Sequence, residues 1–408
     1  MARAAAVGRR VRFADGIRRA YPGLRVATIE RSAEREIVVL CQSAVTEAWC
    51  RLELEVDEHP PHGIALGFTY AAPPSYARHP RALDRQSIAR AVDRYVDRLV
   101  DANLFSGVVA VGDGGRPWLS RAYGRAEAVD QRFGIASMSK MFTAVAIAQL
   151  AQQRRLAFSD PIGRHLPDYP RADVAGSVTI EQLLTHTSGL GDYLDDAAFQ
   201  AARAAGRTFA TPRDYFPYFA SEPLAFAPGE RFEYSNAGYV VLGEVVARVS
   251  GRDYFDYVTE FVLRPAGMHA TDPRGTHGSP AGSAVSTAGD LLRFAHALHS
   301  HRLLDPGHTK LVLAPRVEAP FGGSYAYGFF VRHRGTPDRI VGHDGESAGV
   351  NALLDLYMAR GTAVVVLADQ DPPSARNVAS KLETLLLRPP ASERRRAVTQ
   401  PRASRVGR

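Results

Sequence analysis

The stretch RFGIASMSKMFTAVAIAQL, residues 132–150, decides the fold of this chain. From Ser137 onward the segment has no polar face, and a helix that is apolar nearly all round is a buried helix. Ser137 and Lys140 are three residues apart, so a helix places their hydroxyl and amine on one face within hydrogen-bonding reach. Burial disfavours the charged form of Lys140 and lowers its pKa toward a range where it accepts a proton. The segment therefore predicts a buried helix that carries a serine nucleophile beside its base.

A second element of polar chemistry lies in APGERFEYSNAGYVVLG, residues 227–243. Here Tyr234 supplies a phenol that can carry a proton between Ser137 and a leaving group, and Asn236 supplies an amide that can hold Lys140 in place. A loop tyrosine beside an Asx turn is the alternative interpretation. A serine and a lysine at this spacing recur by chance, so the hypothesis depends on further elements in the right order.

The third element is His343-Asp344-Gly345 on a predicted strand, where His343 supplies a polar or cationic group and Gly345 leaves room for a substrate along the strand edge. The same stretch, GHDGESAG, holds Ser347 in a G-x-S-x-G pattern, which exposes the nucleophile of α/β-hydrolases at a strand-to-helix turn. Those enzymes place a histidine after the nucleophile, and no histidine follows His343. GVNALLDLYMA, which comes next, alternates like a strand. Ser347 is therefore predicted to be a strand residue and not the nucleophile.

With S-x-x-K, Y-x-N and H-x-G in this order, the chain resembles the serine β-lactamase and penicillin-binding-protein-like hydrolases, in the class C-like branch that includes DD-peptidases and β-lactamase-fold esterases. The resemblance covers roughly residues 82–388 and includes TIEQLLTHTSGL and SAVSTAGDLLRF. It implies a serine hydrolase that forms an acyl-enzyme with a small-molecule or peptide-like ester or amide, without cofactor or metal. The alternatives are a true β-lactamase or D-alanyl-D-alanine carboxypeptidase, and a sensor that is acylated without turnover.

The resemblance also implies a role for each motif residue. Ser137 is the acylated nucleophile, and Lys140 and Tyr234 together are the general base and then the acid. Asn236 orients Lys140 and a substrate amide, and His186 in THTSGL is structural. The groups around the substrate are then Asn236, His343, Asp344 and Gly345, with the backbone N–H groups of Ser137 and Glu346 as the oxyanion hole.

Asp344 departs from the pattern of many relatives, in which a Thr or Ser hydroxyl at this position helps to bind a substrate carboxylate. A carboxylate here repels a second carboxylate in a partly desolvated cleft by about 1 kcal/mol or more. Penicillins and D-Ala-D-Ala peptides both carry such a group. We therefore expect a preference for neutral or amine-bearing esters and amides, unless the side chain of Asp344 points away from the cleft.

The order of predicted elements indicates an α/β (α+β) sandwich, with an antiparallel sheet flanked by helices plus an all-helical lobe. Residues 1–70 read as a small α+β unit, with a helix in FADGIRRAYPG and three strand-like runs, and resemble an NTF2-like segment. Residues 71–81 read as a linker, residues 82–388 as the hydrolase domain, and residues 389–408 as a basic disordered tail. Residues 82–104 predict an amphipathic helix, which has Ile88, Val92, Tyr95, Val96 and Leu99 on one side.

The charge of +7 belongs mostly to the C-terminal end, because residues 388–408 hold seven Arg and one Glu. The remainder is close to neutral, so no nucleic-acid partner is expected, although the tail leaves binding to nucleic acid or an anionic surface as an alternative. No apolar run is long enough to span a bilayer, and the N-terminus is not a signal peptide. We expect a cytoplasmic protein, or a periplasmic or secreted one if the start omits an export signal. The sequence leaves the oligomeric state open.

The cysteines and a histidine cluster complete the set of candidate sites. In a hairpin about Val45-Thr46, residues whose numbers add to 91 face each other, which pairs Cys41 with Cys50. A cross-strand disulfide is conceivable there, and two buried thiols are the alternative. A metal site formed by His296, His299 and His301 is less favoured than solvated histidines at a helix end.

Overall fold

We describe a computed structural model of the chain, for residues 21–56, 64–71, 74, 83–275, 277–319, 323–333 and 335–387. The chain divides into two compact units, one of Met1–Ala102 with Arg376–Arg408 and one of Asn103–Ala375. The predicted limits of the N-terminal unit, the linker and the hydrolase domain stay predictions. Most of the predicted FADGIRRAYPG helix, most of the linker and the predicted tail lie outside the described residues.

The larger unit is built on a sheet of eight described strands in the order β6-β5-β14-β13-β12-β11-β10-β9, and every neighbouring pair is antiparallel. The central strands β5, β13 and β14 are buried over nearly their whole length, which fits their runs of Val, Leu and Ala. The strands are β5 (Gly107–Asp113), β6 (Arg116–Tyr123), β9 (Val317–Ala319), β10 (Gly323–Tyr325), β11 (Phe330–Arg332), β12 (Ile340–Ser347), β13 (Val350–Tyr357) and β14 (Thr362–Ala368). A small separate pair consists of β7 (Phe133–Gly134) and β8 (Val285–Ser286).

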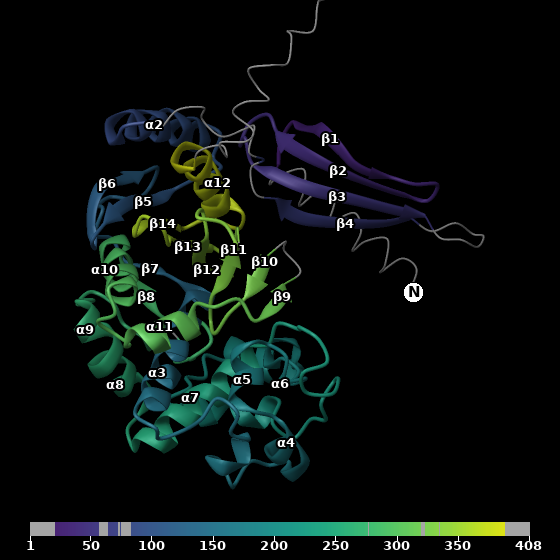
Figure 1. Cartoon of the computed structure of the whole chain (residues 1–408), viewed down its shortest axis with the longest axis vertical. Coiled ribbons are helices and arrows are strands. Elements are labelled where there is room, and N and C mark those ends of the chain that lie inside the picture. Colours follow the sequence, from purple (N-terminus) through teal and green to yellow (C-terminus); the bar gives the residue numbers. More distant parts are fainter. Residues whose placement is uncertain are drawn as a thin grey trace, which may run out of the picture. The chain divides into compact units, whose positions relative to one another are not determined.

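Helices fill most of the chain between β7 and β9 (Figure 1). They are η2 (Ala136–Met138), α3 (Ser139–Gln152), η3 (Ile162–Arg164), α4 (Ala172–Ser177), α5 (Ile180–Leu184), η4 (Tyr193–Asp195), α6 (Ala197–Ala204), η5 (Pro212–Tyr218), α7 (Asn236–Ser250), α8 (Tyr254–Val258), the π-helical η6 (Thr259–Leu263), α9 (Arg264–Ala266), α10 (Ala288–His299) and α11 (Pro306–Val312). The predicted combination of an antiparallel sheet with helices is confirmed.

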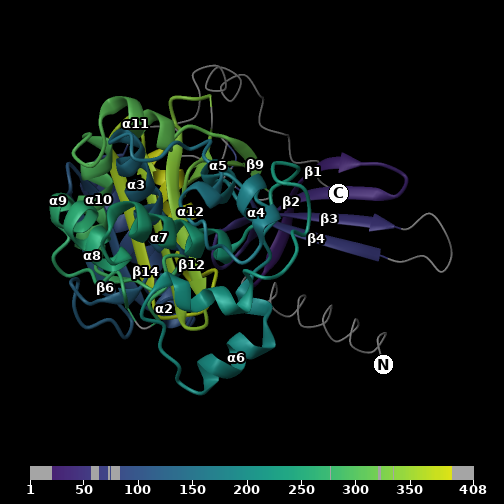
Figure 2. The ribbon, with the colours of Figure 1, turned by 90° about the horizontal axis from the view of Figure 1, so that it is seen from below.

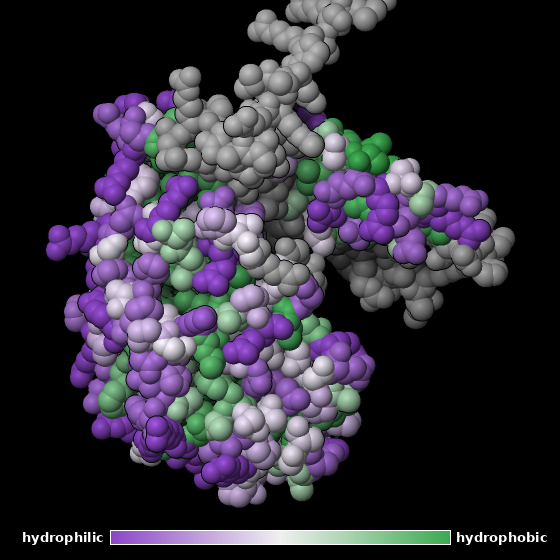
Figure 3. Space-filling model, in the orientation of Figure 1, coloured by the Kyte–Doolittle hydropathy of each residue, from purple (hydrophilic) through white to green (hydrophobic). Residues whose placement is uncertain are grey.

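Helix α3 lies in the core, as its composition predicts. Every residue from Ser139 to Leu150 is buried, and α3 packs against α7, α8 and α11. Figure 2 shows α3 and α7 side by side. Helix α10 packs on β5, β6 and β14. On the viewed face of this unit, hydrophilic residues predominate, which agrees with an apolar interior (Figure 3).

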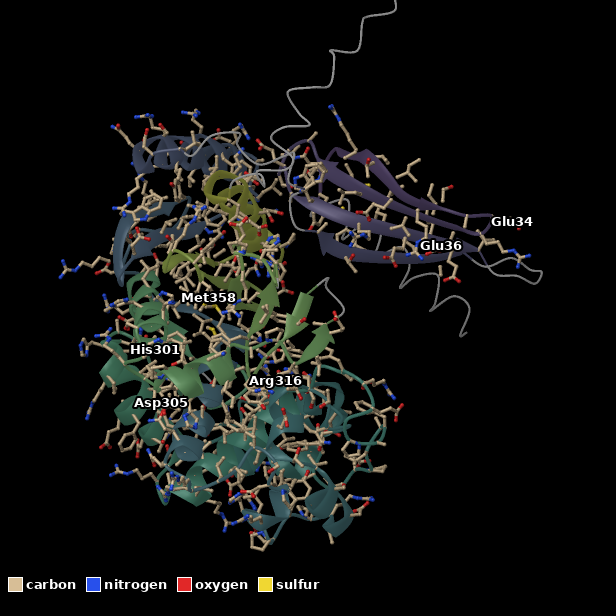
Figure 4. All side chains as sticks on the ribbon, viewed as in Figure 1. Glu34, Glu36, His301, Asp305, Arg316 and Met358 are labelled. Carbon is tan, nitrogen blue, oxygen red and sulfur yellow. The ribbon has the colours of Figure 1, made fainter. Side chains whose placement is uncertain are left out.

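The smaller unit contains the four-stranded antiparallel sheet β1-β2-β3-β4. Its strands are β1 (Leu24–Ser32), β2 (Glu36–Ser43), β3 (Trp49–Val56) and β4 (Ile64–Ala71). The sequence predicted three strands in this unit, whereas the described residues form four, so the prediction was wrong by one strand. The pairing of β1 with β2 is irregular at two places, which breaks the period-two alternation by which strands are recognised in a sequence. Figure 4 labels Glu34, which lies in the turn between these two strands, and Glu36, which begins β2.

The predicted register of the hairpin is confirmed, because Cys41 pairs with Cys50 across β2 and β3. Both thiols are free and buried in a small cluster with Tyr21 and Val39. Burial raises the pKa of Cys50 to about 12. These cysteines are therefore apolar packing residues and poor nucleophiles in this structure.

Two of the described helices belong wholly or mainly to the smaller unit. Helix α2 (Arg85–Asp101) begins after the N-cap Asp84, and its buried residues are the five that the sequence predicts on one side. Helix α12 (Ser374–Leu386) begins at the end of the larger unit. The carboxylate of Glu47 in the β2–β3 turn binds Arg98 of α2 and Lys381 of α12, which ties these helices to the sheet.

Candidate active site

Ser137 and Lys140 lie at the start of the buried helix, although the local geometry differs from a plain α-helical turn. Ser137 is in the 3₁₀ turn η2, and α3 begins two residues later. Side chains three residues apart are aligned in a 3₁₀ turn, so the two groups still face each other. Ala136, directly before Ser137, has φ of 41°, an uncommon conformation for a residue other than glycine. Strained backbone of this kind is concentrated at functional sites.

The amine of Lys140 is enclosed by three oxygen atoms. Its Nζ lies 3.1 Å from Ser137 Oγ, 2.7 Å from Asn236 Oδ1 and 2.6 Å from the backbone oxygen of Ala281. The side chain is fully buried. The structure therefore brings together Ser137, Lys140 and Asn236, which come from two motifs almost a hundred residues apart.

Burial controls the charge of this amine. Removal from water lowers the pKa of Lys140 to about 7, and the nearby carboxylate of Asp192 opposes this effect. The rings of Tyr234 and Tyr239 also lie near Nζ, at 4.8 and 5.5 Å from their centroids. An amine in this environment exists in both its neutral and its charged form near neutral pH.

Tyr234 lies on the loop that leads into α7. Burial raises the pKa of its phenol well above 10, a hydrogen bond with Ser137 opposes the rise, and the charge of Asp344 adds to it. The phenol is thus next to the serine and stays protonated at neutral pH. Its ring stacks on His186, with centroids 4.2 Å apart and an interplanar angle of 29°.

The segment 185–192 holds the Tyr234 loop in place through hydrogen bonds. One of its residues, Asp192, contacts Asn236 and was not predicted as a site residue from the sequence. His186 Nδ1 accepts a hydrogen bond from Ser235 N at 3.1 Å, and burial lowers the pKa of His186 well below 6.5, so the ring is neutral. Asp192 Oδ2 accepts hydrogen bonds from both N and Nδ2 of Asn236, each at 2.8 Å. The only signal for Asp192 in the sequence is its place just after THTSGL.

The third motif lies on β12, as predicted. His343 is buried, its Nδ1–H donates to the carbonyl oxygen of Asp344, and its Nε2 shares a 3.0 Å hydrogen bond with the hydroxyl of Tyr325. Asp344 is half-buried, with 23% of its side chain exposed. Ser347 ends the strand, is exposed, and is followed by strand β13 rather than by a helix. The prediction that Ser347 is a strand residue is confirmed.

Gly345 brings β12 against the nucleophile turn. A Cβ atom at this position would lie 2.0 Å from the carbonyl oxygen of Ile135 and 3.2 Å from the Cβ of Ala136. No side chain fits there, so the backbone of β12 lies directly on η2. This contact sets Gly345 against Ile135 and Ala136, which directly precede Ser137. The role of the N–H groups of Ser137 and Glu346 as an oxyanion hole stays a prediction.

The histidines of the predicted helix end lie elsewhere. His296 and His299 are on α10, and His301, labelled in Figure 4, follows the helix and is exposed. Among the residues that the structure describes, no three His, Cys, Asp or Glu side chains form a group that could hold a metal ion.

Comparison with known proteins identifies the family to which this chain belongs. The sequence profile of the family described as "Beta-lactamase" matches residues 92–387. The chain belongs to this family. Within the described residues, no helix has the length and apolar character needed to cross a membrane.

Individual relatives agree with this assignment. The chain is 25% identical to penicillin-binding protein 4* of Bacillus subtilis over 70% of this chain and 73% of that protein. It is 35% identical to esterase EstB of Burkholderia gladioli, over 46% of this chain and about half of the esterase, 52%. A solved penicillin-binding protein from Bacillus halodurans superposes with a TM-score of 0.62 at 30% identity, covering 70% of this chain and 98% of that one. The prediction of a serine hydrolase of the β-lactamase-related family is confirmed at this level.

Proposed function

We propose that the protein hydrolyses an ester or amide through a covalent acyl intermediate on Ser137, with Lys140 as the base. The observation that carries the proposal is the set of partners around the amine. Two of the three, Asn236 Oδ1 and the oxygen of Ala281, can only accept hydrogen bonds. In the neutral amine they occupy both N–H groups, so the lone pair faces the third partner, the Ser137 hydroxyl.

The pKa of Lys140, about 7, supports this role. A base is most effective when its pKa is close to the working pH, because it is then available and still accepts the proton readily. The proton of Ser137 passes to Nζ as its oxygen attacks the acyl carbon. The resulting ammonium has three acceptors within reach, so the charged state is also held by hydrogen bonds.

Tyr234 supplies the next proton. Its raised pKa keeps the phenol protonated, and it lies next to Ser137, where the leaving group departs. In the proposed step, Tyr234 donates its proton to the leaving oxygen or nitrogen and regains one from Lys140. Water then cleaves the Ser137 ester by the same groups acting in reverse.

The strand edge and the backbone donors complete the site. Strand β11 pairs with β12 only as far as Gly342, so the segment 343–347 extends beyond this pairing. A substrate lying along this segment has the N–H groups of Ser137 and Glu346 beside its carbonyl oxygen. Loss of one such donor typically costs about two to three orders of magnitude in rate.

For the substrate class, we propose neutral or amine-bearing esters and amides. The carboxylate of Asp344 acts on the site, because its charge contributes to the raised pKa of Tyr234. The same charge opposes a substrate carboxylate. A penicillin or a peptide with a free C-terminus is therefore expected to react more slowly than a short nitrophenyl ester.

The proposal is tested by intact-protein mass after a pulse of a p-nitrophenyl ester. The wild type is expected to show a transient acyl adduct and a burst of nitrophenol, and Ser137→Ala neither. Ser347→Ala is the matched control, because Ser347 lies on the same strand as the third motif, and it should behave as the wild type. An adduct on Ser137→Ala would overturn the proposal, and an adduct that persists would identify a non-turnover sensor instead.

A further inference from the structure

Asp192 lies beside the proposed base without touching it. Its Oδ2 accepts from Asn236 N and from Asn236 Nδ2, both at 2.8 Å, and its Oδ1 accepts from Leu194 N at 3.0 Å. The carboxylate is therefore fixed by three donors, of which one is the side-chain amide of Asn236. The same amide meets Lys140 with its oxygen, at 2.7 Å.

From this arrangement we infer that Asp192 is a positioning residue, which forces Asn236 to present its oxygen to Lys140 and thereby keeps the amine's lone pair directed at Ser137. The inference rests on the proposed function of Ser137 and Lys140. It assigns to Asp192 a part in the reaction that the three motifs do not indicate.

The physical reason lies in what each group can accept or donate. A carboxylate only accepts hydrogen bonds, so Asp192 can hold only the NH₂ end of the Asn236 amide. If the amide were reversed, its oxygen would face the carboxylate oxygen at hydrogen-bonding distance. Its NH₂ would then face Nζ and donate to the lone pair of the neutral amine. Lys140 would lose the electron pair with which it removes the proton from Ser137.

The surrounding segments leave the amide little freedom. Ser235 Oγ donates to the carbonyl of Gly191 at 2.9 Å, and Glu233 N donates to the carbonyl of His186 at 2.8 Å. The loop of residues 233–236 is thus docked along the segment 186–192 by its backbone. With the backbone of the loop held in this way, the side-chain amide of Asn236 can still turn end for end, and Asp192 selects one of the two orientations.

Asp192 also acts through its charge. It stabilises the ammonium of Lys140, against the larger effect of burial. The other titratable groups that face this amine are His186, Tyr234 and Tyr239, and Asp344 acts on Tyr234 from β12. Removal of the Asp192 charge leaves these groups in place, so the pH at which Lys140 loses its proton moves downward.

Two substitutions separate the effect of Asp192 on the orientation of the Asn236 amide from the effect of its charge on Lys140. In Asp192→Asn, the new amide oxygen can still accept from both donors of Asn236, while its NH₂ takes the place of the oxygen that accepts from Leu194 N. The orientation of Asn236 is kept, and the charge and the hydrogen bond from Leu194 are lost. We expect a burst rate at high pH within about threefold of the wild type, with the rising limb of the pH profile shifted to lower pH. In Asp192→Ala both are lost, and the burst rate should fall about 10- to 100-fold, the range found when a residue that orients a metal ligand is replaced.

The matched control is Asp196→Ala, four residues further along the chain, which removes the side-chain N-cap of α6 and makes no hydrogen bond to Asn236. It should lower the melting temperature and leave the pH profile and burst rate unchanged. A double variant carries both Asn236→Ala and Asp192→Ala, and its burst rate is compared with that of Asn236→Ala alone. At high pH, where Lys140 is neutral in every variant, Asp192 acts through Asn236, so the second substitution should then cost less than about threefold beyond the first.

The outcomes separate this inference from the proposed function. An unchanged burst rate and pH profile in Asp192→Ala would overturn the inference, and so would an equally large loss in the Asn236→Ala background. A loss in Asp196→Ala as large as in Asp192→Ala would also overturn it, because the effect would then be general loosening of the segment. Hydrolysis that survives Ser137→Ala would instead overturn the proposed function.

Discussion

Replacement of Gly345 by alanine tests how the nucleophile turn and strand β12 are held together. The added Cβ would lie 2.0 Å from the carbonyl oxygen of Ile135 and 2.9 Å from its carbonyl carbon. Contacts of a real Cβ below 3.0 Å are essentially never seen, so the two backbones must separate by about 1 Å. The atoms that meet are backbone on one side, so no side chain can rotate to relieve the contact.

A separation of this size acts on the proposed oxyanion hole, whose two N–H groups lie on the two backbones concerned. Misplacement of a reacting group by about 1 Å can cost about 100-fold in rate, and loss of one oxyanion donor costs about 100- to 1,000-fold. We therefore expect Gly345→Ala to slow formation of the Ser137 acyl-enzyme by about two to three orders of magnitude. The effect should appear in kcat, because the donors act on charge that develops during the reaction.

The measurement is the rate of the nitrophenol burst in a stopped-flow experiment, beside a thermal melt that reports folding. Gly134→Ala is the control, because a Cβ there would meet only Val350, at an ordinary 3.4 Å. That variant should keep the wild-type burst. A folded Gly345→Ala protein with a burst rate within about threefold of the wild type would refute the proposed contact between β12 and the nucleophile.

Two further predictions concern charge. Because only the neutral form of Lys140 accepts a proton and its pKa is about 7, the burst rate should rise between about pH 6 and pH 8 and then level off; a rise that begins only above pH 9 would contradict the buried amine. Asp344→Thr should increase kcat/KM for a carboxylate-bearing substrate relative to a neutral ester by about fivefold or more, which corresponds to the loss of about 1 kcal/mol of repulsion. Equal changes for both substrates would show that Asp344 does not select against the carboxylate.

Much of the fold follows from local patterns in the sequence. The one-sided helix α2 and the buried helix α3 are both recognised from the distribution of their apolar residues. Such patterns are reliable where a segment is long and regular. The irregular pairing of β1 and the short strands β9 to β11 carry no comparable periodicity, and they were not predicted individually.

In the candidate site, too, some features are local in the sequence and others depend on residues far apart in the chain. Ser137 and Lys140 are neighbours on one turn, so their proximity is a local property that the spacing alone predicts. The partners that hold Lys140 come from Asn236 and Ala281, which are 96 and 141 residues further along the chain. The contribution of Ala281 is a backbone oxygen, which every residue has and which no side-chain pattern can indicate.

The sequence by itself determined which groups do the proposed chemistry and in which order they occur. It gives the identity of each side chain directly, and the spacing of polar and apolar residues indicates the local secondary structure. Only the tertiary structure decided that the two N–H groups of the neutral amine are occupied, that Asp192 fixes the amide of Asn236, and that Gly345 lies against the nucleophile turn. Those features depend on the paths of loops that meet in space, and the energies that select those paths are sums over many distant contacts rather than properties of any one segment.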